Sequence, residues 1–572
     1  MSIGSKITRI YGGFRGVDFR GEEINLVRSP DSLNVWKDYK KTESIRTRPG
    51  MELQHDFENT VYGIYFYKGE MLVHSGSKLL VIKKGNQYTL HEGMRPAISD
   101  GFIYDNIFYI KDGENYLRYN GTSVTDVRDN AYVPTYSIGR KPNGGGSTYQ
   151  DINLLTGKRI NTFLADNESK DYYLDAQNID DDFIPVVIVN DKEQRVDTDF
   201  TVDYAQGKIS FTYAPTTEGR TDGQDNVSVK FKKNITLQNG EDYSSIILKC
   251  TLLQVFDNRV FFSGNPDYPN VVYHCSLDDP TYCSDLDYYR EGMDSAQVKG
   301  LVAGNNALWA FREPSESATN IFYHIPTLDD DYGKIYPSTH SSVTIGCVGK
   351  AINFNDDIVF FSERGMEGIS GDITTEQVAA HRSSLVDRKL ISEDNYKNMI
   401  LAEWEGYLFV FVGTNDGTNV YLADSRSVFT NENHIEYEWF YWKLDKTVTC
   451  ARVHNGMLFV GTTDGVYTFT DNEKHIKSWW TTPKDKFKYP QHQKTTNKKG
   501  CVAEAEGDIT VYAKTEKTEF EEVGSFKDVT DYFVGRIKKK KFKDIQLKFY
   551  SKTRFSLETV TLEAYIGAFV KR

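Results

Sequence analysis

The sequence predicts an all-β protein: a β-propeller of about six to eight blades with an inserted β-sandwich and a C-terminal β-sandwich. Two observations lead to this prediction. First, a glycine, asparagine or aspartate followed by a run of apolar β-forming residues occurs seven times. Second, 13% of the 572 residues are aromatic, and aromatic residues favour strands. The seven turn positions are Gly69, Asn106, Asn258, Asn306, Asp357, Gly406 and Gly456.

The spacing of this phrase indicates a repeat. From Asn258 onward, successive turn positions are 48, 51, 49 and 50 residues apart. A fixed period near 50 residues is typical of a repeat architecture such as a propeller. In the first repeat, apolar runs at 61–66, 71–73 and 79–82 are separated by tight turns, which predicts three consecutive strands.

The places where the period fails predict the other domains. Residues 1–60 show little periodicity, and we expect an extended N-terminal arm there. The propeller then occupies 61–146 and 237–480, with an inserted β-sandwich at 147–236. Residues 481–572 form a linker followed by a C-terminal β-sandwich.

Each non-propeller domain has its own evidence. The insertion follows a Gly-Gly-Gly-Ser run, which is typical of a linker, and it contains several short apolar runs with turn signals between them. Residues 481–500 are rich in Lys, Pro and Gln, whereas 557–565 alternates apolar and polar residues as a strand with one buried face does. In the second half of the propeller, 375–391 has helical spacing, and we expect a short helix there. The runs inside the insertion are 186–189, 200–204, 208–211 and 227–231.

Bulk properties exclude several classes of protein. The net charge of −13 argues against a general nucleic-acid coat, which would be basic. The sequence contains no apolar stretch of about 18 residues, so we expect no membrane segment, and residues 1–6 lack the apolar part of a secretory signal. We therefore expect a protein made and folded in a cytoplasm. The six cysteines form no CxxC pair, which favours structural thiols over a zinc site.

No catalytic motif stands out. Glu363, Glu403 and Glu405 lie near repeat strands and have the residue type of a glycosidase carboxylate pair, but no motif selects two of them. The acidic runs Asp180–Asp182 and Asp329–Asp331 lack the alternating ligands and central glycine of a calcium loop. We therefore expect no enzyme, no catalytic residue, no cofactor and no metal ligand.

Two further clusters each allow two interpretations. The basic stretch Arg536–Lys543 is either an edge strand whose lysines block aggregation or a contact for phosphate or an acidic neighbour. The aromatic run Trp439–Trp442 is either core or interface, or a carbohydrate-binding patch.

Three segments, in their order along the chain, resemble one protein family. They are the arm phrases Ser29–Asn34 and Arg46–Gly50, the stretch Phe256–Pro266 with Asp279–Tyr282, and the insertion segment Asp203–Phe211. Together with the intervening propeller they look like the tail hub, nozzle or "stabilisation" proteins of short-tailed phages.

The resemblance implies a virion structural protein, assembled in the host cytoplasm. It implies a ring, of six copies by analogy, that continues the DNA channel below the portal and adaptor. Such a ring retains packaged DNA, lets it pass without specific binding, and anchors tail fibres or a tail tip. The alternative is a carbohydrate- or receptor-binding propeller of a tail fibre or surface protein.

Overall fold

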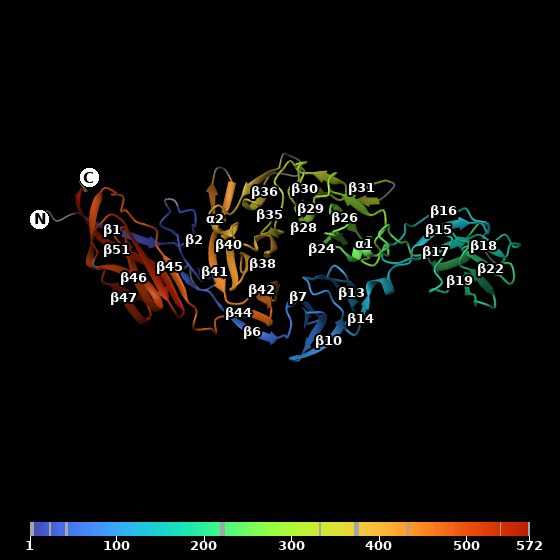
Figure 1. The fold of residues 1–572 in the computed structure, drawn as a ribbon, viewed down its shortest axis with the longest axis horizontal. Coiled ribbons are helices and arrows are strands. Elements are labelled where there is room, and N and C mark those ends of the chain that lie inside the picture. Colours follow the sequence, from blue (N-terminus) through green and yellow to red (C-terminus); the bar gives the residue numbers. More distant parts are fainter. Residues whose placement is uncertain are drawn as a thin grey trace.

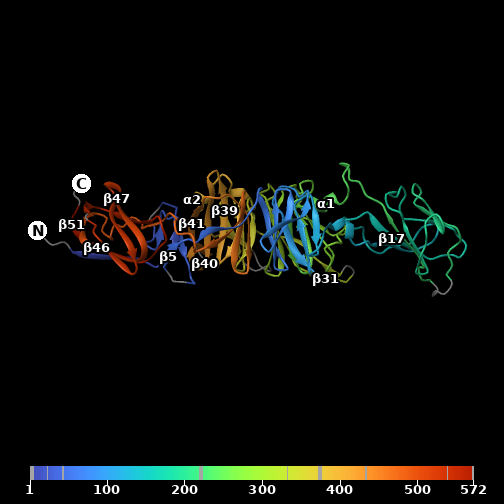
Figure 2. The same cartoon turned by 90° about the horizontal axis from the view of Figure 1, so that it is seen from below.

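The computed structural model describes residues 5–21, 24–40, 44–217, 223–330, 333–370, 377–431, 434–537 and 539–569. These residues form an elongated all-β molecule of three domains (Figure 1). The propeller lies in the middle, the inserted domain at one end, and the C-terminal domain at the other end, in both views (Figures 1 and 2). The fold class predicted from the sequence is confirmed.

The propeller consists of seven four-stranded sheets among the described residues, and each sheet is one blade. Its strands are β7 (Val61–Tyr67), β8 (Glu70–Ser75), β9 (Lys78–Lys83) and β10 (Asn86–Glu92) in blade 1; β11 (Asp100–Tyr104), β12 (Ile107–Lys111), β13 (Tyr116–Tyr119) and β14 (Val124–Asp126) in blade 2; β24 (Leu252–Phe256), β25 (Arg259–Ser263), β26 (Val271–His274) and β27 (Tyr288–Arg290) in blade 3; β28 (Val298–Gly304), β29 (Ala307–Arg312), β30 (Ile321–His324) and β33 (Ser338–His340) in blade 4; β34 (Ala351–Phe354), β35 (Asp357–Ser362), β36 (Gly365–Ser370) and β37 (Val378–His381) in blade 5; β38 (Ile400–Trp404), β39 (Tyr407–Thr414), β40 (Gly417–Asn431) and β41 (His434–Leu444) in blade 6; and β42 (Val448–His454), β43 (Met457–Thr462), β44 (Gly465–Thr470) and β6 (Gly50–Asp56) in blade 7.

The repeated turn phrase marks the hairpin between the first two strands of every blade. At each of these hairpins two consecutive residues have positive φ. That geometry belongs to a type I′ turn, which suits the twist of paired strands and favours Asn, Asp and Gly. In blade 5 the two turn residues are Asn355 and Asp356, so Asp357 begins β35 and is not a turn residue. With Asp356 in its place, the last four spacings become 48, 50, 50 and 50.

The N-terminal arm closes the propeller. Strand β6 pairs antiparallel with β44, so blade 7 takes three strands from the end of the repeat and one from the arm. The first strands of neighbouring blades pack around the axis. Closure by a strand from the other end of the repeat leaves no exposed gap between the first and last blades.

The inserted domain has two sheets around its own core. Its strands are β15 (Thr135–Arg140), β16 (Ser147–Thr148), β17 (Lys158–Phe163), β18 (Asp171–Tyr173), β19 (Val186–Val189), β20 (Lys192–Glu193), β21 (Phe200–Asp203), β22 (Lys208–Phe211) and β23 (Val227–Lys232). Six of them form one sheet and three form the other. The domain therefore begins at Thr135, earlier than the predicted start at 147, because β15 pairs parallel with β17.

One loop of the insertion returns to the propeller. Leu154 and Leu155 are buried in the core shared by blades 2 and 3. Asn153 donates from Nδ2 to the carbonyls of Tyr132 and Thr281, both at 2.9 Å. The inserted domain therefore contacts the propeller not only at its two ends but also through this internal loop.

The C-terminal domain and the arm share one ten-stranded sheet. Its strands are β1 (Lys6–Gly12), β4 (Val35–Lys37), β5 (Ile45–Thr47), β45 (Ser478–Thr481), β46 (His492–Thr515), β47 (Thr518–Val529), β48 (Tyr532–Gly535), β49 (Lys540–Phe542), β50 (Ile545–Ser551) and β51 (Phe555–Phe569). The arm is therefore not simply extended: three of its strands belong to this sheet. The predicted linker at 481–500 is also wrong in part, because β46 begins at His492 and pairs with the distant β51.

A single hydrophobic core joins the C-terminal domain to blades 6 and 7. It includes Trp36 and Ile45 of the arm, Trp442 and Phe469 of the propeller, and Phe549 of the C-terminal sheet. The inserted domain, in contrast, has a separate core. The propeller and the C-terminal domain are consequently packed as one body.

The helix expected over 375–391 is wrong for most of its length. Residues 375 and 376 lie outside the described residues, and 378–381 form β37, the outer strand of blade 5. Pairing with β36 overrides the helical spacing. Within this range only α2 (Asp387–Leu390) is helical.

The remaining short elements are α1 (Ser245–Leu248), the 3₁₀ turns η1 (Val127–Asn130) and η2 (Tyr396–Asn398), and the pairs β2 (Gly16–Val17) with β3 (Arg28–Ser29) and β31 (Thr327–Asp329) with β32 (Gly333–Ile335).

Candidate functional site: the propeller axis

The propeller axis holds two neighbouring cavities. The inner one has a volume of about 280 Å³ and is lined by the first strands of blades 1, 2, 5, 6 and 7. The outer one has a volume of about 620 Å³ and adds residues of blades 3 and 4. Ile98 and Lys350 line both cavities. Every blade therefore lines at least one of the two axial cavities, where clustered strand ends can present polar groups to a ligand.

Two charged groups of opposite sign, Asp100 and Lys350, line the inner cavity, and Lys350 also lines the outer one. Lys350 and Asp100 are both half-buried. Burial lowers the pKa of the Lys350 ammonium and raises the pKa of the Asp100 carboxyl. The Gly101 amide donates to Asp100 at 2.8 Å. Burial acts against the charged form of each group, so an ion entering here would meet charges that are poorly solvated.

The outer cavity is rich in lysine. Lys299 and Lys397 line it together with Lys350, facing Glu313 and Glu363. Lys299 donates to Gln297 Oε1 at 2.7 Å and lies 3.7 Å from Glu313. Such a lining can bind small polar or anionic molecules by charge and hydrogen bonds.

The three glutamates considered for glycoside hydrolysis do not come together. Glu363 follows the second strand of blade 5, whereas Glu405 lies in the turn between the first and second strands of blade 6. In an up-and-down blade these two kinds of turn lie on opposite faces of the propeller, separated by the length of a strand. Glu405 pairs with Lys40 of the arm. Glu403 is exposed on the first strand of blade 6, and partial desolvation by the surrounding strands together with the charge of Asp356 raises its pKa.

The aromatic run Trp439–Trp442 is core. Trp439, Phe440 and Trp442 are completely buried, and Tyr441 is 7% exposed. Trp442 Nε1 donates to the Val35 carbonyl at 3.1 Å, so this run also holds the arm. The run therefore offers no surface patch for a carbohydrate.

The basic stretch Arg536–Lys543 lies on the C-terminal sheet. Ile537 and Phe542 are buried, Arg536 and Lys541 are exposed, and Lys539 pairs with Glu521. Lys538 lies outside the described residues. The stretch thus combines two apolar anchors with exposed cations, and whether it contacts phosphate stays a prediction.

The acidic runs and the cysteines have ordinary roles where they are described. Asp180 accepts from the Asn234 amide at 2.8 Å, and Asp182 pairs with Lys232. Asp331 lies outside the described residues. All six cysteines are free and buried, and burial raises their pKa values. Within the described ranges, no group of three or more His, Cys, Asp or Glu residues is placed to hold a metal ion.

One charged cluster escaped the sequence analysis. His381 on β37 has Nε2 2.5 Å from Asp387 Oδ2 and Nδ1 3.2 Å from Glu367 Oε1. Burial alone would lower the pKa of His381, but the hydrogen bonds to the two carboxylates raise it to about 10. No motif signals this cluster, because Glu367 and His381 are brought together by the pairing of β36 with β37, and Asp387 follows on α2. Lys350 and Asp100 were missed because they belong to different blades and line the same cavity only once the propeller is closed.

Together these features define a seven-bladed β-propeller protein with two additional β-domains. No helix in the described parts of the chain is both long and apolar enough to cross a membrane.

Neither a protein-family model nor a curated protein matches the sequence. Among similar solved structures, BamB from Moraxella catarrhalis is 12% identical, with 74% of this chain and 98% of that chain covered, at a TM-score of 0.33. The Dos1 propeller is 9% identical over 75% of this chain and 96% of that chain, at 0.32. An exo-beta-1,3-galactanase from Phanerochaete chrysosporium is 9% identical over 54% and 95%, at 0.23. Similarities this low carry no conclusion about function.

Proposed function

We propose that this chain is a virion structural protein, a hub or nozzle subunit of a short phage tail. In this proposal, copies of the chain form a ring of six below the portal and adaptor, retain packaged DNA, and anchor fibres or a tail tip. The proposal rests first on the resemblance of the arm, propeller and insertion phrases to that family. No enzymatic activity is part of it.

The structural observation that carries the proposal is that strands of the N-terminal arm belong both to the propeller and to the C-terminal sheet. Strand β6 closes the propeller, while β1, β4 and β5 belong to the C-terminal sheet. The shared core makes these two bodies one packed unit, and the inserted domain projects from the opposite end (Figure 1). A rigid body with different domains at its two ends suits a subunit that contacts different neighbours above and below a ring.

The charge supports the same proposal. The chain carries a net charge of −13. A surface of the same sign as DNA resists non-specific adhesion, which suits a channel that DNA must leave quickly.

The C-terminal sheet offers a surface for contact between copies. Ile10, Thr561, Val502 and Val534 lie directly opposite one another across β1, β51, β46 and β48, and so share one face. Ile10 is 64% exposed, Val502 37% and Val534 41%. Exposed apolar side chains gathered on one face are typical of an interaction surface.

The test is ring formation. The purified chain is mixed with portal–adaptor complexes and examined by electron microscopy, and disrupted virions are analysed by mass spectrometry. We expect rings with wild type and their loss with the double substitution Val502→Lys and Val534→Lys. Val196→Lys, on the inserted domain, is the matched control. A chain that stays monomeric with adaptor present and is absent from virions contradicts the proposal.

The carbohydrate-binding alternative is not carried further. Its best candidate surface was the aromatic run in blade 6, and those side chains are buried.

A further inference from the structure

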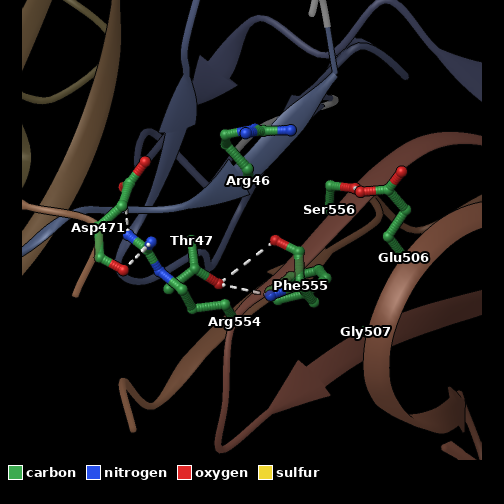
Figure 3. Close-up of a pocket in the computed structure, with 8 residues that line it drawn as sticks. All are labelled: Arg46, Thr47, Asp471, Glu506, Gly507, Arg554, Phe555 and Ser556. Atoms are coloured by element: carbon green, nitrogen blue, oxygen red, sulfur yellow. Dashed lines mark hydrogen bonds and ion pairs between the residues drawn. The ribbon is translucent and has the colours of Figure 1, made fainter. Parts of the chain in front are cut away.

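A small pocket lies where the arm, the end of blade 7 and the C-terminal sheet meet (Figure 3). Its volume is about 250 Å³, and it is separate from the propeller axis. Glu506 and Asp471 on its rim are exposed, so the pocket is open to solvent. It is lined by Arg46, Thr47, Asp471, Glu506, Gly507, Arg554, Phe555 and Ser556.

Three of these residues form a row across three adjacent strands. Arg46 on β5 is directly opposite Ser556 on β51, and Ser556 is directly opposite Glu506 on β46. Residues opposite one another in antiparallel strands point to the same face, with neighbouring Cβ atoms about 5 Å apart. The row therefore places a guanidinium, a hydroxyl and a carboxylate side by side on one wall of the pocket.

Arg46 has no partner among the described residues. Its Nε is buried and makes no hydrogen bond. Figure 3 shows its guanidinium extending away from Asp471, with no interaction to any residue drawn. A buried donor on a charged group that lacks an acceptor is unfavourable, so this position favours occupation by an acceptor from outside the chain.

The other arginines of the junction are paired. Arg554 Nη2 donates to Asp471 Oδ1 at 2.6 Å, and its Nη1 donates to the Asp471 carbonyl at 2.7 Å. Arg48 Nε donates to Asn34 Oδ1 at 3.1 Å. Arg46 therefore differs from the neighbouring arginines, which have hydrogen-bond partners within the described residues. Asp471 already accepts hydrogen bonds from Arg554.

The opposite end of the row is a carboxylate that is only weakly engaged by the described residues. Glu506 has one long contact, 3.5 Å from Ser556 Oγ, and its side chain is exposed. The pocket consequently offers a planar donor at one end and a carboxylate acceptor at the other, with a hydroxyl between them.

We propose that this pocket binds a small carboxylate that carries a hydroxyl or amino group near its carboxyl end. The ligand carboxylate takes two hydrogen bonds from the Arg46 guanidinium, whose fork matches carboxylate geometry. The ligand's own hydroxyl or amino group donates to Glu506. A phosphate dianion fits less well, because Glu506 and Asp471 repel a second negative charge.

Binding at this place would strengthen the existing attachment of the arm strand β5 to the C-terminal sheet. A ligand that binds the folded junction and not the unfolded chain stabilises the fold in proportion to its concentration. The site thus makes the attachment of the arm sensitive to a small molecule, independently of whether the chain forms a ring.

The test uses the full-length chain with glucuronate, glycolate and glycine as probes. Glucose and inorganic phosphate serve as comparison ligands. Glucose is neutral and has no carboxylate, and inorganic phosphate is an anion of different geometry and charge. Isothermal titration calorimetry measures the affinity of each probe, and thermal unfolding with and without the probe measures the shift in the unfolding midpoint. We expect saturable binding of at least one probe, a rise in the midpoint, and clearly weaker binding of glucose and phosphate.

The variants assign the binding to the row. We expect Arg46→Gln to weaken probe binding at least tenfold and Glu506→Gln, at an exposed side chain, to weaken it severalfold. Arg290→Gln, at an exposed arginine on β27 in blade 3, is the matched control and keeps wild-type affinity. Arg46→Lys keeps the charge without the fork and is expected to be intermediate.

Three outcomes overturn the proposal: none of the three probes binds, Arg46→Gln binds as wild type does, or phosphate binds as tightly as the best carboxylate. Circular dichroism of each variant shows whether a loss of binding comes from a loss of fold. If Arg46→Gln unfolds, the exposed Glu506→Gln decides the result.

Discussion

Arg28 and Glu438 form a buried ion pair with two hydrogen bonds. Arg28 Nε and Nη2 donate to Glu438 Oε2 and Oε1 at 2.9 and 2.7 Å, across 410 positions of sequence. Arg28 is 9% exposed and Glu438 is fully buried. Burial raises the pKa of Glu438, and the hydrogen bonds from Arg28 oppose that rise. The pair attaches β3 of the arm to β41, the outer strand of blade 6.

Removing Arg28 should therefore destabilise the protein strongly. Arg28→Met leaves the buried Glu438 carboxylate without its main partner, and we expect a loss of about 3–5 kcal/mol. Urea unfolding followed by tryptophan fluorescence measures the change. In the double variant Arg28→Met with Glu438→Leu, most of this loss should be recovered, because no unpaired charge remains.

The control for this pair is Lys40→Met. Lys40 pairs with Glu405, but its side chain is 71% exposed. An exposed ion pair contributes about 0–1 kcal/mol, so this variant should unfold near the wild-type midpoint. Equal effects of Arg28→Met and Lys40→Met would contradict the interpretation.

The closing strand predicts a difference between two neighbouring proline substitutions. The Met51 amide donates to Glu473 Oε2 at 3.3 Å, so it does not face β44. Amide directions alternate along a strand, so the Glu52 amide faces β44 and the Leu53 amide does not. Glu52→Pro should cost about 3 kcal/mol or more, whereas Leu53→Pro should be tolerated better.

Both side chains are exposed, but Glu52 Oε2 accepts a hydrogen bond from Asn472 at 3.0 Å, so Glu52→Ala and Leu53→Ala are the controls that separate side-chain from backbone effects. Thermal unfolding and hydrogen exchange of 465–470 on β44 measure the result. If Leu53→Pro is the more damaging substitution, the pairing assigned to blade 7 is wrong.

The hydrogen bonds of Asn153 should stabilise the contact between the inserted domain and the propeller. It is 1% exposed, donates to two carbonyls, and accepts from the Leu155 and Cys283 amides at 3.0 and 3.1 Å. Asn153→Ala leaves several buried groups unpaired, each costing about 1–3 kcal/mol. We expect faster hydrogen exchange at 281–283 and a lower thermal midpoint. The exposed Asn239→Ala should change neither.

His274 predicts a loss of stability in mild acid. Burial lowers the pKa of His274 to about 4, while an unfolded histidine has a pKa near 6.5. Between these values the unfolded chain binds the proton and the folded protein does not. Stability should therefore fall as the pH drops from about 6.5 to about 4, by up to about 3 kcal/mol from this residue.

The measurement compares urea midpoints at pH 7.5 and 4.5. His274→Phe keeps the aromatic packing beside Phe261 and Tyr289 and should reduce the dependence on pH. His340→Phe, at an exposed site on β33, should leave the dependence unchanged. A wild-type dependence retained in full by His274→Phe would assign it to other groups.

Local signals explain what could be predicted from the sequence. The type I′ turns at the start of each blade need residues that tolerate positive φ, and Asn, Asp and Gly therefore recur with a period near 50. The apolar runs around them are strands because the same residues fill the space between neighbouring blades. The candidate sites carried no such signal. Lys350, Asp100 and Arg46 are ordinary residues that become distinctive only through their neighbours.

The expectations that failed involve partners far away in the sequence. Residues 378–381 have helical spacing, yet they pair with β36. The polar segment before Gly500 resembles a linker, yet β46 pairs with β51 from His492 onward. The arm lacks periodicity because its short strands complete sheets that are built elsewhere in the chain.

The class of fold, the period of the repeat and the presence of extra β-domains could be predicted from residue order, because turn chemistry and apolar alternation are local properties. Four features emerge only from the folded chain: the seven blades, the closure by β6, the common core of propeller and C-terminal domain, and the row of Arg46, Ser556 and Glu506. The closure by β6 and the Arg46–Ser556 pairing join segments hundreds of residues apart, whereas the number of blades and the common core depend on how all the sheets pack together, so local signals reveal none of them.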